Sequence, residues 1–350
     1  MTAALMGGMS APHRPVLLKE AIRLLAPERG GLFVDGTLGL GGHSEAILEV
    51  SDEVRVIGID RDREALAYAM NRLARFGSRF TGAHANFQDI TRVLHEAKAS
   101  EVSGVLIDLG VSSLQLDTAT RGFSFRHDAP LDMRMNASGD EETAAALLER
   151  LPEEEIARII YEYGEERRSR RIARWIVEKR EAGQPIKTTG ALAELVARAY
   201  GARGKSEHGV HPATRTFQAL RIAVNDELEN LAAFIETAID LLIPGGRFCA
   251  ISFHSLEDRI VKHTLRRLAG YCECPPRLAP VCACGTRHTV EILTRRPLAP
   301  DETEMEENPR ARSAKLRACR KLESNDLESG KLREDEFEDD SIENEEFKES

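Results

Sequence analysis

The sequence predicts an α/β fold in which a mostly parallel sheet is covered by helices on both faces. In the first third of the chain, strand-like apolar runs alternate with helix-like segments, at 32–35, 43–50, 54–60, 62–76, 80–84, 89–98 and 105–110. Such alternation is typical of parallel sheets, because two parallel strands need a long crossover connection. Strand-like runs at 248–253, 289–294 and 313–319 indicate that the sheet continues near the end of the chain.

A glycine-rich stretch follows the first predicted strand. Four glycines lie within seven positions between Asp35 and His43, and helix-like sequence follows at once. Glycine lets a turn adopt positive φ and lets a ligand approach the backbone, and the free N–H groups of a helix start favour a polar or anionic group. This pattern favours a nucleotide-like cofactor. Because the spacing is not G-x-G-x-x-G, a plain strand-to-helix connection is the alternative.

Two residues beyond later strands support a cofactor site. Asp60 ends the second predicted strand about 20 residues after the loop, where doubly wound sheets carry an acid that binds ribose hydroxyls. The alternative is that Asp60 caps the helix that starts near Asp62. Phe87 lies just beyond a strand end, where it could stack on adenine or belong to the core. Together they favour a nucleoside-containing cofactor without distinguishing NAD from S-adenosylmethionine.

The middle of the chain, 115–214, shows no clear strand and is predicted to be a helical insertion. Helix-like segments lie at 143–150, 152–164, 167–180 and 190–200, and one long helix is expected over 214–242. The segment 167–180 is rich in arginine, which favours contact with nucleic-acid phosphates. The alternative is a solvated helix whose arginines pair with neighbouring glutamates.

The net charge of −10 comes from the end of the chain. Residues 323–350 hold 13 acidic and 3 basic side chains, so the rest of the chain is neutral and the acidic total does not exclude a nucleic-acid substrate. We expect this tail to be disordered. The sequence has no apolar run of membrane-span length and no signal-peptide pattern from Met1 to Pro12. We therefore expect a cytoplasmic protein without membrane contact.

Two C-x-C pairs raise the question of a metal site. They are Cys272 with Cys274, and Cys282 with Cys284. Four thiolates can bind zinc tetrahedrally, but this spacing is tighter than the usual C-x₂-C. We therefore expect free thiols and no metal, with a zinc site as the alternative.

Long motifs along the chain resemble those of one protein family. They are DGTLGLGGH (35–43), IDRD (59–62), DLGVSSLQLD (108–117), RGFSF (121–125), PLDMRM (130–135), YGEER (163–167), HPATRTFQALR (211–221), SFHSLEDR (252–259) and ENPRARS (307–313). Over about residues 13–320, the chain is similar to the RsmH (MraW) family of ribosomal RNA small-subunit methyltransferase H.

The resemblance implies a class I, Rossmann-like, S-adenosylmethionine-dependent methyltransferase fold with a mostly parallel seven-stranded sheet. We expect a discontinuous methyltransferase domain at 13–114 and 215–322, an all-helical insertion at 115–214 that recognises RNA, and the tail at 323–350. The implied reaction transfers a methyl group to N4 of a cytidine in the decoding region of 16S rRNA. The implied partner is 16S rRNA or the small ribosomal subunit, and the oligomeric state is open, with a homodimer as one option.

The family's cofactor contacts correspond to Gly41, Gly42, His43, Asp60, Phe87, Asp108 and Gln115. Asp108 is also the candidate catalytic residue. It follows the fourth strand, beside the expected methyl group. The delocalised exocyclic amine of cytosine needs acceptors for its hydrogens as positive charge develops on N4. The sequence does not separate the two roles of Asp108.

Other residues are candidates for the RNA substrate. His211, Thr214 and Arg215 precede or open the helix that returns from the insertion. Arg221 on the same helix is a further candidate, although it could equally pair with Glu227.

The segment after the fourth strand lacks the aromatic residue with which amino-methyltransferases usually stack the flipped base. We hypothesise that Phe123, Phe125 or His254 takes its place, with ordinary packing as the alternative.

Two other functions are compatible with parts of this pattern. A nicotinamide-dependent oxidoreductase uses the same strand–turn–helix unit, and a non-catalytic RNA-binding assembly factor could retain a methyltransferase fold. Binding of S-adenosylmethionine rather than NAD would separate a methyltransferase from the first. The presence of the glycine loop, Asp60 and Asp108 disfavours the second.

Overall fold

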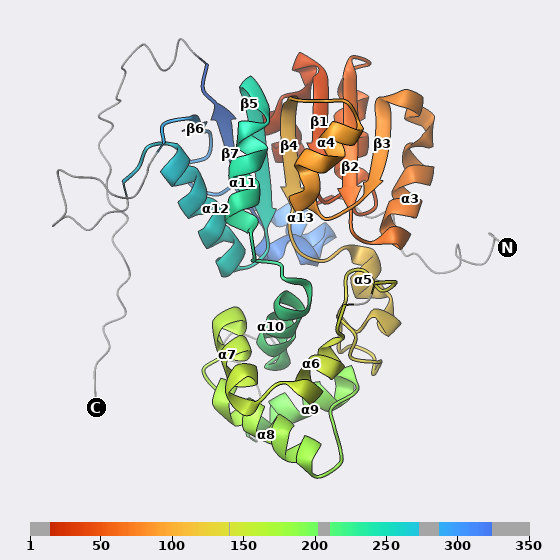
Figure 1. The fold of residues 1–350 in the computed structure, drawn as a ribbon, viewed down its shortest axis with the longest axis vertical. Helices are drawn as coiled ribbons and strands as arrows, with labels where there is room; N and C mark the ends of the chain where they lie inside the picture. Colours follow the sequence, from red (N-terminus) through yellow and green to blue (C-terminus); the bar gives the residue numbers. More distant parts are fainter. Residues whose placement is uncertain (1–14, 140, 202–210, 273–286, 324–350) are drawn as a thin grey trace.

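The computed structural model describes residues 15–139, 141–201, 211–272 and 287–323. Within them, one sheet carries helices on both faces, and a helical lobe lies beyond the carboxyl ends of its strands, below the sheet in Figure 1. The helices from Ala144 to Asn225, between the fourth and fifth strands, form this lobe. The predicted Rossmann-like α/β class, with its mostly parallel seven-stranded sheet and helical insertion after the fourth strand, is confirmed.

The sheet has the strand order β3-β2-β1-β4-β5-β7-β6. Its strands are β1 (Gly31–Asp35), β2 (Val54–Asp60), β3 (Phe80–His84), β4 (Val102–Asp108), β5 (Leu242–Ser252), β6 (Val290–Ile292) and β7 (Lys315–Lys321). All pairs from β3 to β5 are parallel, and β7 pairs antiparallel with both β5 and β6. The strand order reverses direction between β1 and β4, which is where doubly wound sheets open a ligand crevice.

Alternating side chains of the strands pack against helices on opposite faces. The helices of this part are α1 (Leu18–Leu25), α2 (Gly42–Val50), α3 (Arg63–Leu73), α4 (Ile90–Glu96), α11 (Leu231–Asp240), α12 (Ser255–Leu268) and α13 (Glu302–Glu307). Phe33 packs with buried residues of α1, α2 and α3, whereas its neighbour Val34 packs with α4, α11 and α12. This follows from the two-residue period of a strand. Both faces are therefore buried, and this explains the continuous apolar runs in the sequence.

The helical lobe has a core of its own. After the short helix α5 (Ser113–Asp117), it consists of α6 (Ala144–Arg150), α7 (Glu153–Gly164), α8 (Ser169–Glu181), α9 (Thr189–Ala199) and α10 (Ala213–Asn225). Ile160, Ile176 and Phe217 are among the buried side chains that α7, α8 and α10 contribute to this core. No strand is present among its described residues. The boundary expected between 214 and 215 falls inside α10.

The single helix expected over 214–242 is wrong, because this segment forms the two helices α10 and α11. Asp226 and Asn230 between them have left-handed backbone angles, with φ of 50° and 59°. The break has a packing reason, since α10 buries its apolar face in the lobe and α11 buries its own against the sheet. Both faces are helical in period, so the sequence pattern does not reveal that they belong to different cores.

The fifth strand begins earlier than the expected run at 248–253. It starts at Leu242 and includes the sequence Pro244-Gly245-Gly246, across which the pairing with β4 shifts register. This turn is therefore a bulge within β5. None of the helices in the described part of the chain is long and apolar enough to cross a membrane.

Candidate active site

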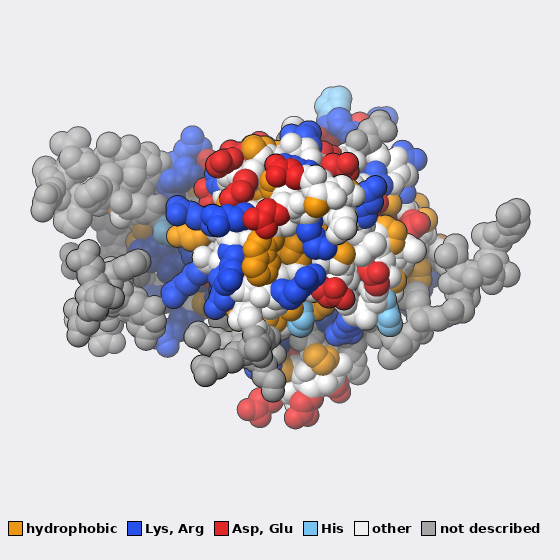
Figure 2. Space-filling view, turned by 90° about the horizontal axis from the view of Figure 1, so that it is seen from below, with side chains coloured by type: hydrophobic (Ala, Val, Ile, Leu, Met, Phe, Trp, Pro, Cys, Tyr) orange, Lys and Arg blue, Asp and Glu red, His pale blue; other side chains and the backbone are white. Residues whose placement is uncertain are grey.

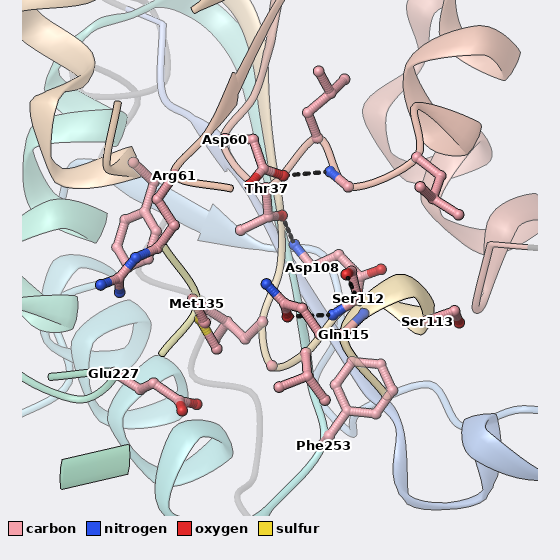
Figure 3. Close-up of a pocket in the computed structure, with 18 of the residues that line it drawn as sticks. Thr37, Asp60, Arg61, Asp108, Ser112, Ser113, Gln115, Met135, Glu227 and Phe253 are labelled. Atoms are coloured by element: carbon pink, nitrogen blue, oxygen red, sulfur yellow. Dashed lines mark hydrogen bonds between the residues drawn. The ribbon is translucent and has the colours of Figure 1, made fainter. Parts of the chain in front are cut away.

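A cavity of about 380 Å³ opens at the carboxyl ends of the central strands, between the sheet and the helical lobe (Figure 3). Its wall includes the glycine loop after β1, Asp60 after β2 and residues 86–88 after β3. Much of the rest of the wall comes from two further segments, which are residues 108–116 after β4 and residues 221–227 at the end of α10. Strands β1, β2 and β4 each end in an aspartate, so three carboxyl groups gather at this edge.

Asp35 supports the glycine loop from behind. It is buried and accepts hydrogen bonds from the Ser44 hydroxyl at 2.7 Å and from the Thr37 N–H at 3.3 Å. Burial raises the pKa of Asp35 to about 6, although these two hydrogen bonds oppose the rise. Asp35 does not belong to the cavity wall and acts on loop conformation.

Asp60 ties the loop to β2 and faces the cavity. Its Oδ2 accepts the Gly39 N–H at 2.7 Å and its Oδ1 accepts the Asp62 N–H at 2.8 Å. Burial raises the pKa of Asp60 to about 7. Asp62, not Asp60, caps α3 by accepting from the Glu64 N–H, so the capping alternative for Asp60 is wrong. Each Asp60 oxygen has a second lone pair for a ribose hydroxyl, and the residue therefore fits a nucleoside.

Asp108 lines the cavity and has one carboxyl oxygen without a hydrogen-bond partner among the described residues. Its N–H donates to the Thr37 hydroxyl at 2.6 Å, which holds the end of β4 against the glycine loop. Its Oδ1 is buried and has no hydrogen-bond partner among the described residues. Burial, followed by the negative charges of Asp35 and Glu257, raises the pKa of Asp108 well above its usual range. A buried acceptor without a partner indicates that a ligand supplies the donor.

His43 lies beside Asp108. Its Nε2 is 3.0 Å from the Val16 carbonyl oxygen, and its Nδ1 is 3.7 Å from Asp108 Oδ2. Because a carbonyl only accepts, we assign the ring hydrogen to Nε2. The Nδ1 atom therefore faces the Asp108 carboxyl group.

The glycine loop leaves room where side chains would collide. Gly41 precedes α2 with φ of 80°, a left-handed conformation that L side chains rarely adopt. A Cβ on Gly42 would lie 2.4 Å from the Pro15 ring, and Gly42 itself lines the cavity. The two glycines thus serve loop geometry as well as access for a ligand.

Phe87 and Gln115 complete the nucleoside end of the site. Phe87 lines the cavity and meets the Phe234 ring edge-on, with centroids 4.7 Å apart, so it is supported by α11. Gln115 is buried, accepts the Ser112 N–H with Oε1 and donates from Nε2 to Asp62 Oδ2 at 3.0 Å. These contacts fix its amide at the wall beside α5.

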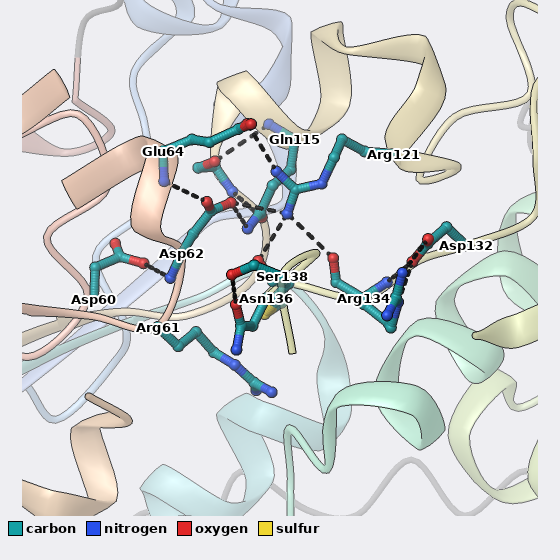
Figure 4. A network of polar contacts seen from close by, with 12 residues as sticks. Asp60, Arg61, Asp62, Glu64, Gln115, Arg121, Asp132, Arg134, Asn136 and Ser138 are labelled. Carbon is teal, nitrogen blue, oxygen red and sulfur yellow. Dashed lines mark hydrogen bonds and ion pairs between the residues drawn. The ribbon is translucent and has the colours of Figure 1, made fainter. Parts of the chain in front are cut away.

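A buried ion pair connects this end of the site to the loop that leads into the lobe (Figure 4). Arg121 Nη2 is 2.9 Å from Asp62 Oδ2 and also donates to the carbonyl oxygens of Arg134 and Met135. Asn225 contacts the same loop, since it accepts the Met135 N–H and donates to the Met133 carbonyl. The loop is therefore held from both lobes. The sequence motifs contain these residues, but their spacing gave no indication of a shared contact.

The structure brings together most of the predicted cofactor residues. Those that line the cavity are Gly42, His43, Asp60, Phe87, Asp108 and Gln115, whereas Gly41 lies just behind it. None of the four substrate candidates, His211, Thr214, Arg215 and His254, belongs to the cavity wall. The first three are exposed near the start of α10, and their role as RNA contacts stays a prediction.

The three residues expected to stack on a base have other contacts. Phe123 is buried in the lobe core, and Phe125 packs against His211 and Phe217 there. His254 caps α12 by accepting the Glu257 N–H, and its Nε2 lies 3.1 Å from Glu257 Oε1. The packing alternative therefore describes all three. The residues that do line this part of the cavity are Met135 and Phe253, which the sequence reasoning missed although both belong to quoted motifs.

Arg221 pairs with Glu227, which is the alternative to RNA contact that the sequence left open. Its Nε and Nη2 donate to the two carboxylate oxygens at 2.8 and 2.7 Å, and both residues line the cavity. Of the proposed zinc ligands, Cys272 is exposed, and Cys274, Cys282 and Cys284 lie outside the described residues. The expectation of free thiols at these positions stays a prediction.

Much of the arginine-rich segment has structural contacts. Arg168 and Arg171 donate to the Ala199 carbonyl at the end of α9, and Arg180 donates to carbonyls at the end of α6. On the face seen from below in Figure 2, basic side chains are interleaved with acidic ones. Arg167, Arg170 and Arg174 are exposed and stay candidates for phosphate contact.

Comparison with known proteins identifies the family. The profile of the MraW methylase family matches residues 10–322. A ribosomal RNA small subunit methyltransferase H from Geobacter sulfurreducens is 55% identical over 90% of this chain and 100% of its own length. Its namesake from Heliobacterium modesticaldum is 53% identical over 89% and 98%, respectively.

A solved rRNA methylase structure from Streptococcus thermophilus covers 90% of this chain and 100% of its own, with 11% identity and a TM-score of 0.38. That score is too low to say more about the fold than the strand order does. The matched relatives give no support to an oxidoreductase or to a non-catalytic factor. The family profile covers nearly the whole described chain, including the glycine loop, Asp60 and Asp108, and the chain therefore belongs to the MraW methylase family.

Proposed function

We propose that this protein transfers a methyl group from S-adenosylmethionine to N4 of a cytidine in the decoding region of 16S rRNA. The observation that carries the proposal is the buried, unpartnered Oδ1 of Asp108 in the same cavity as the nucleoside-type residues Asp60 and Phe87. The name of the relatives, ribosomal RNA small subunit methyltransferase H, supports a small-subunit rRNA substrate.

Different residues of the cavity fit different chemical parts of S-adenosylmethionine. Asp60 would hold the ribose hydroxyls, Phe87 would stack on the adenine, and the loop from Gly36 to Gly42 would accommodate the amino-acid portion. When bound, this cofactor supplies an electrophilic methyl group on a positively charged sulfur. The acidic edge made by Asp35, Asp60 and Asp108 favours that charge.

Asp108 would perform the chemistry at the amine. The lone pair of the cytosine amine is delocalised into the ring, so N4 attacks only when it is held in line and its developing charge is stabilised. Asp108 Oδ1 accepts a hydrogen from N4 and takes that proton after the methyl group has been transferred. His43, beside Oδ2, orients the carboxyl group.

The decisive experiment maps N4-methylcytidine in 16S rRNA from cells with and without this protein. We expect one decoding-region cytidine to lose the modification without the protein and to regain it with the wild-type gene but not with Asp108→Ala. An unchanged map would contradict the proposal. Calorimetry with the purified protein provides an independent check, because S-adenosylmethionine should bind and NAD should not.

The RNA partner and the cellular location are part of the same proposal. We propose 16S rRNA as the partner and the cytoplasm as the location, because the substrate is a ribosomal component. Methylation assays on free 16S rRNA and on assembled small subunits would determine which form is used. Sedimentation of the purified protein would test the homodimer.

A further inference from the structure

The cavity extends beyond the nucleoside end toward a second group of residues that no motif assigned to a substrate. Met135, Glu227 and Phe253 line this part together with Asp108. In Figure 3, Met135 and Glu227 lie on the left and Phe253 lies on the right, with Asp108 above Phe253. Two apolar walls and two carboxyl groups are the features that a planar base with an amine would need.

Phe253 forms a rigid wall. It directly follows β5, and its N–H donates at 2.8 Å to Oε2 of Glu257, a carboxylate that is itself buried. Gly110 lies against the ring, since a Cβ at that position would be 3.4 Å from Phe253 Cδ2. Gly110 also has φ of 102°, so the loop after Asp108 is shaped to approach this ring. Phe253 thus lies directly beside the loop that carries the candidate amine acceptor.

Met135 forms the second wall, and its backbone is held from two directions. The Met135 N–H donates to Asn225 Oδ1 at 2.7 Å, and its carbonyl accepts from Arg121 Nη2 at 2.7 Å. Both bonds are buried. The side chain is only 7% exposed and lines the cavity. A thioether adapts to a flat aromatic partner, and sulfur contacts with rings are favourable.

The polar edge of this space matches an exocyclic amine. Asp108 Oδ1 has no partner among the described residues, and each Glu227 oxygen accepts one hydrogen bond from Arg221. The bidentate contact with Arg221 fixes the position of the two Glu227 carboxyl oxygens, which are hydrogen-bond acceptors. Both carboxyl groups belong to the wall of this space, so each can accept a hydrogen from an amine placed against it.

We propose that Phe253 and Met135 form the slot for the flipped target base, with Phe253 as the stacking residue that the segment after β4 lacks. The proposal rests on the proposed cytidine methylation and names the subsite that this reaction requires. In it, the base lies between the Phe253 ring and the Met135 side chain, and its amine points to Asp108.

The test compares Phe253→Leu and Phe253→Tyr on small ribosomal subunits that lack the modification. Because base–aromatic stacking is lost in Phe253→Leu, we expect kcat/KM to fall by about 5- to 150-fold. Phe253→Tyr keeps a stacking ring and should stay within about 3-fold of wild type. The Kd for S-adenosylmethionine, measured by calorimetry, should change by less than about 3-fold in both, since Phe253 lies away from the nucleoside end.

Phe76→Leu provides the matched control, because Phe76 does not line the cavity and instead packs beneath the guanidinium groups of Arg75 and Arg79. It should leave kcat/KM unchanged. Wild-type kcat/KM in Phe253→Leu, or an equal loss in Phe253→Tyr, would overturn the proposal. Met135→Ala retains both backbone bonds and gives a second measurement, in which an unchanged kcat/KM would also count against the slot. Absence of N4-methylcytidine from the wild-type reaction would instead contradict the proposed function itself.

Discussion

Asp108 links the geometry of the site most directly to chemistry. It is attached to the glycine loop through Thr37 and faces His43, and one of its oxygens is left for a ligand. Asp60 has a different task, because both of its oxygens already hold the backbone around the nucleoside end. The hydrogen bonds thus give different roles to two aspartates that end strands on either side of β1.

We predict that Asp108→Asn binds S-adenosylmethionine within about 5-fold of wild type but transfers methyl at least about 100-fold more slowly, because the amide cannot take a proton. Burial raises the pKa of Asp108, and only the ionised form accepts the amine proton. The wild-type single-turnover rate should therefore rise with pH over a range above that of an ordinary carboxylate, and this limb should vanish in the variant. Weak cofactor binding by Asp108→Asn would instead assign the residue to the cofactor.

We predict that Asp60→Asn raises the Kd for S-adenosylmethionine about 10- to 100-fold, because a charged acceptor for the ribose hydroxyls is lost. Calorimetry measures this change. Asp52→Asn is a matched control, since Asp52 is exposed and outside the cavity. Equal affinities of Asp60→Asn and wild type would remove Asp60 from the cofactor site.

Asp60 also makes stability depend on pH. Its pKa rises from 3.8 to about 7 through burial, so the folded protein binds this proton more tightly than the unfolded chain does. The free energy of unfolding should therefore fall as pH increases from about 4 to about 7. Urea unfolding of the ligand-free protein should show a smaller fall in Asp60→Asn. If the free energy of unfolding fell equally with pH in both proteins, the pH dependence could not be attributed to Asp60.

At the scale of elements, the loop from α5 to α6 is the part most dependent on side-chain contacts. It contains little regular structure, yet Arg121 and Asn225 bind its backbone on either side of Met135. Arg121 and Asp62 are nearly inaccessible, with side chains 7% and 3% exposed. A buried pair of this kind fixes geometry, because either charge alone would be costly to bury.

We predict that Arg121→Met destabilises the protein by about 3–5 kcal/mol, because Asp62 keeps its charge in a buried position without its partner. Urea unfolding at neutral pH measures the effect. Arg92→Met is the control, since Arg92 is exposed between Asp89 and Glu96 and surface ion pairs contribute little to stability. A similar small loss in both variants would show that the buried pair does not hold the loop.

At the scale of the whole molecule, the cavity lies between two cores that fold around different elements. The chain leaves the sheet after β4, builds the lobe, and returns through α10, whose last turn and following loop reach the cavity. On the face seen in Figure 2, basic and acidic side chains are both exposed.

We predict that replacing Arg167, Arg170 and Arg174 together by alanine weakens binding to small ribosomal subunits. It should also reduce the slope of log K against log salt by about 1 to 3, because each lost phosphate contact contributes about 0.7 to 0.9. Filter binding at several salt concentrations measures the slope. Arg158→Ala is the control, since Arg158 is engaged with Glu155 and Glu162. An unchanged slope in the triple variant would remove this surface from the RNA interface.

The sequence by itself determined the strand–helix alternation, the glycine loop, and the acids that end β1, β2 and β4. These features are local, because turn geometry and strand patterning are decided by neighbouring residues. The position of Phe87 beyond a strand end also pointed to the nucleoside end, and the family resemblance added Gln115; both residues line the cavity.

Only the tertiary structure decided where α10 ends, what Arg121 binds and which side chains face the second part of the cavity. Met135, Glu227 and Phe253 come from a loop, a helix connection and a strand end that are far apart in the chain. Their meeting depends on the docking of two separate cores, whose apolar faces have the same helical period in the sequence. For that reason Phe123, Phe125 and His254 were plausible from their motifs but lie in other surroundings.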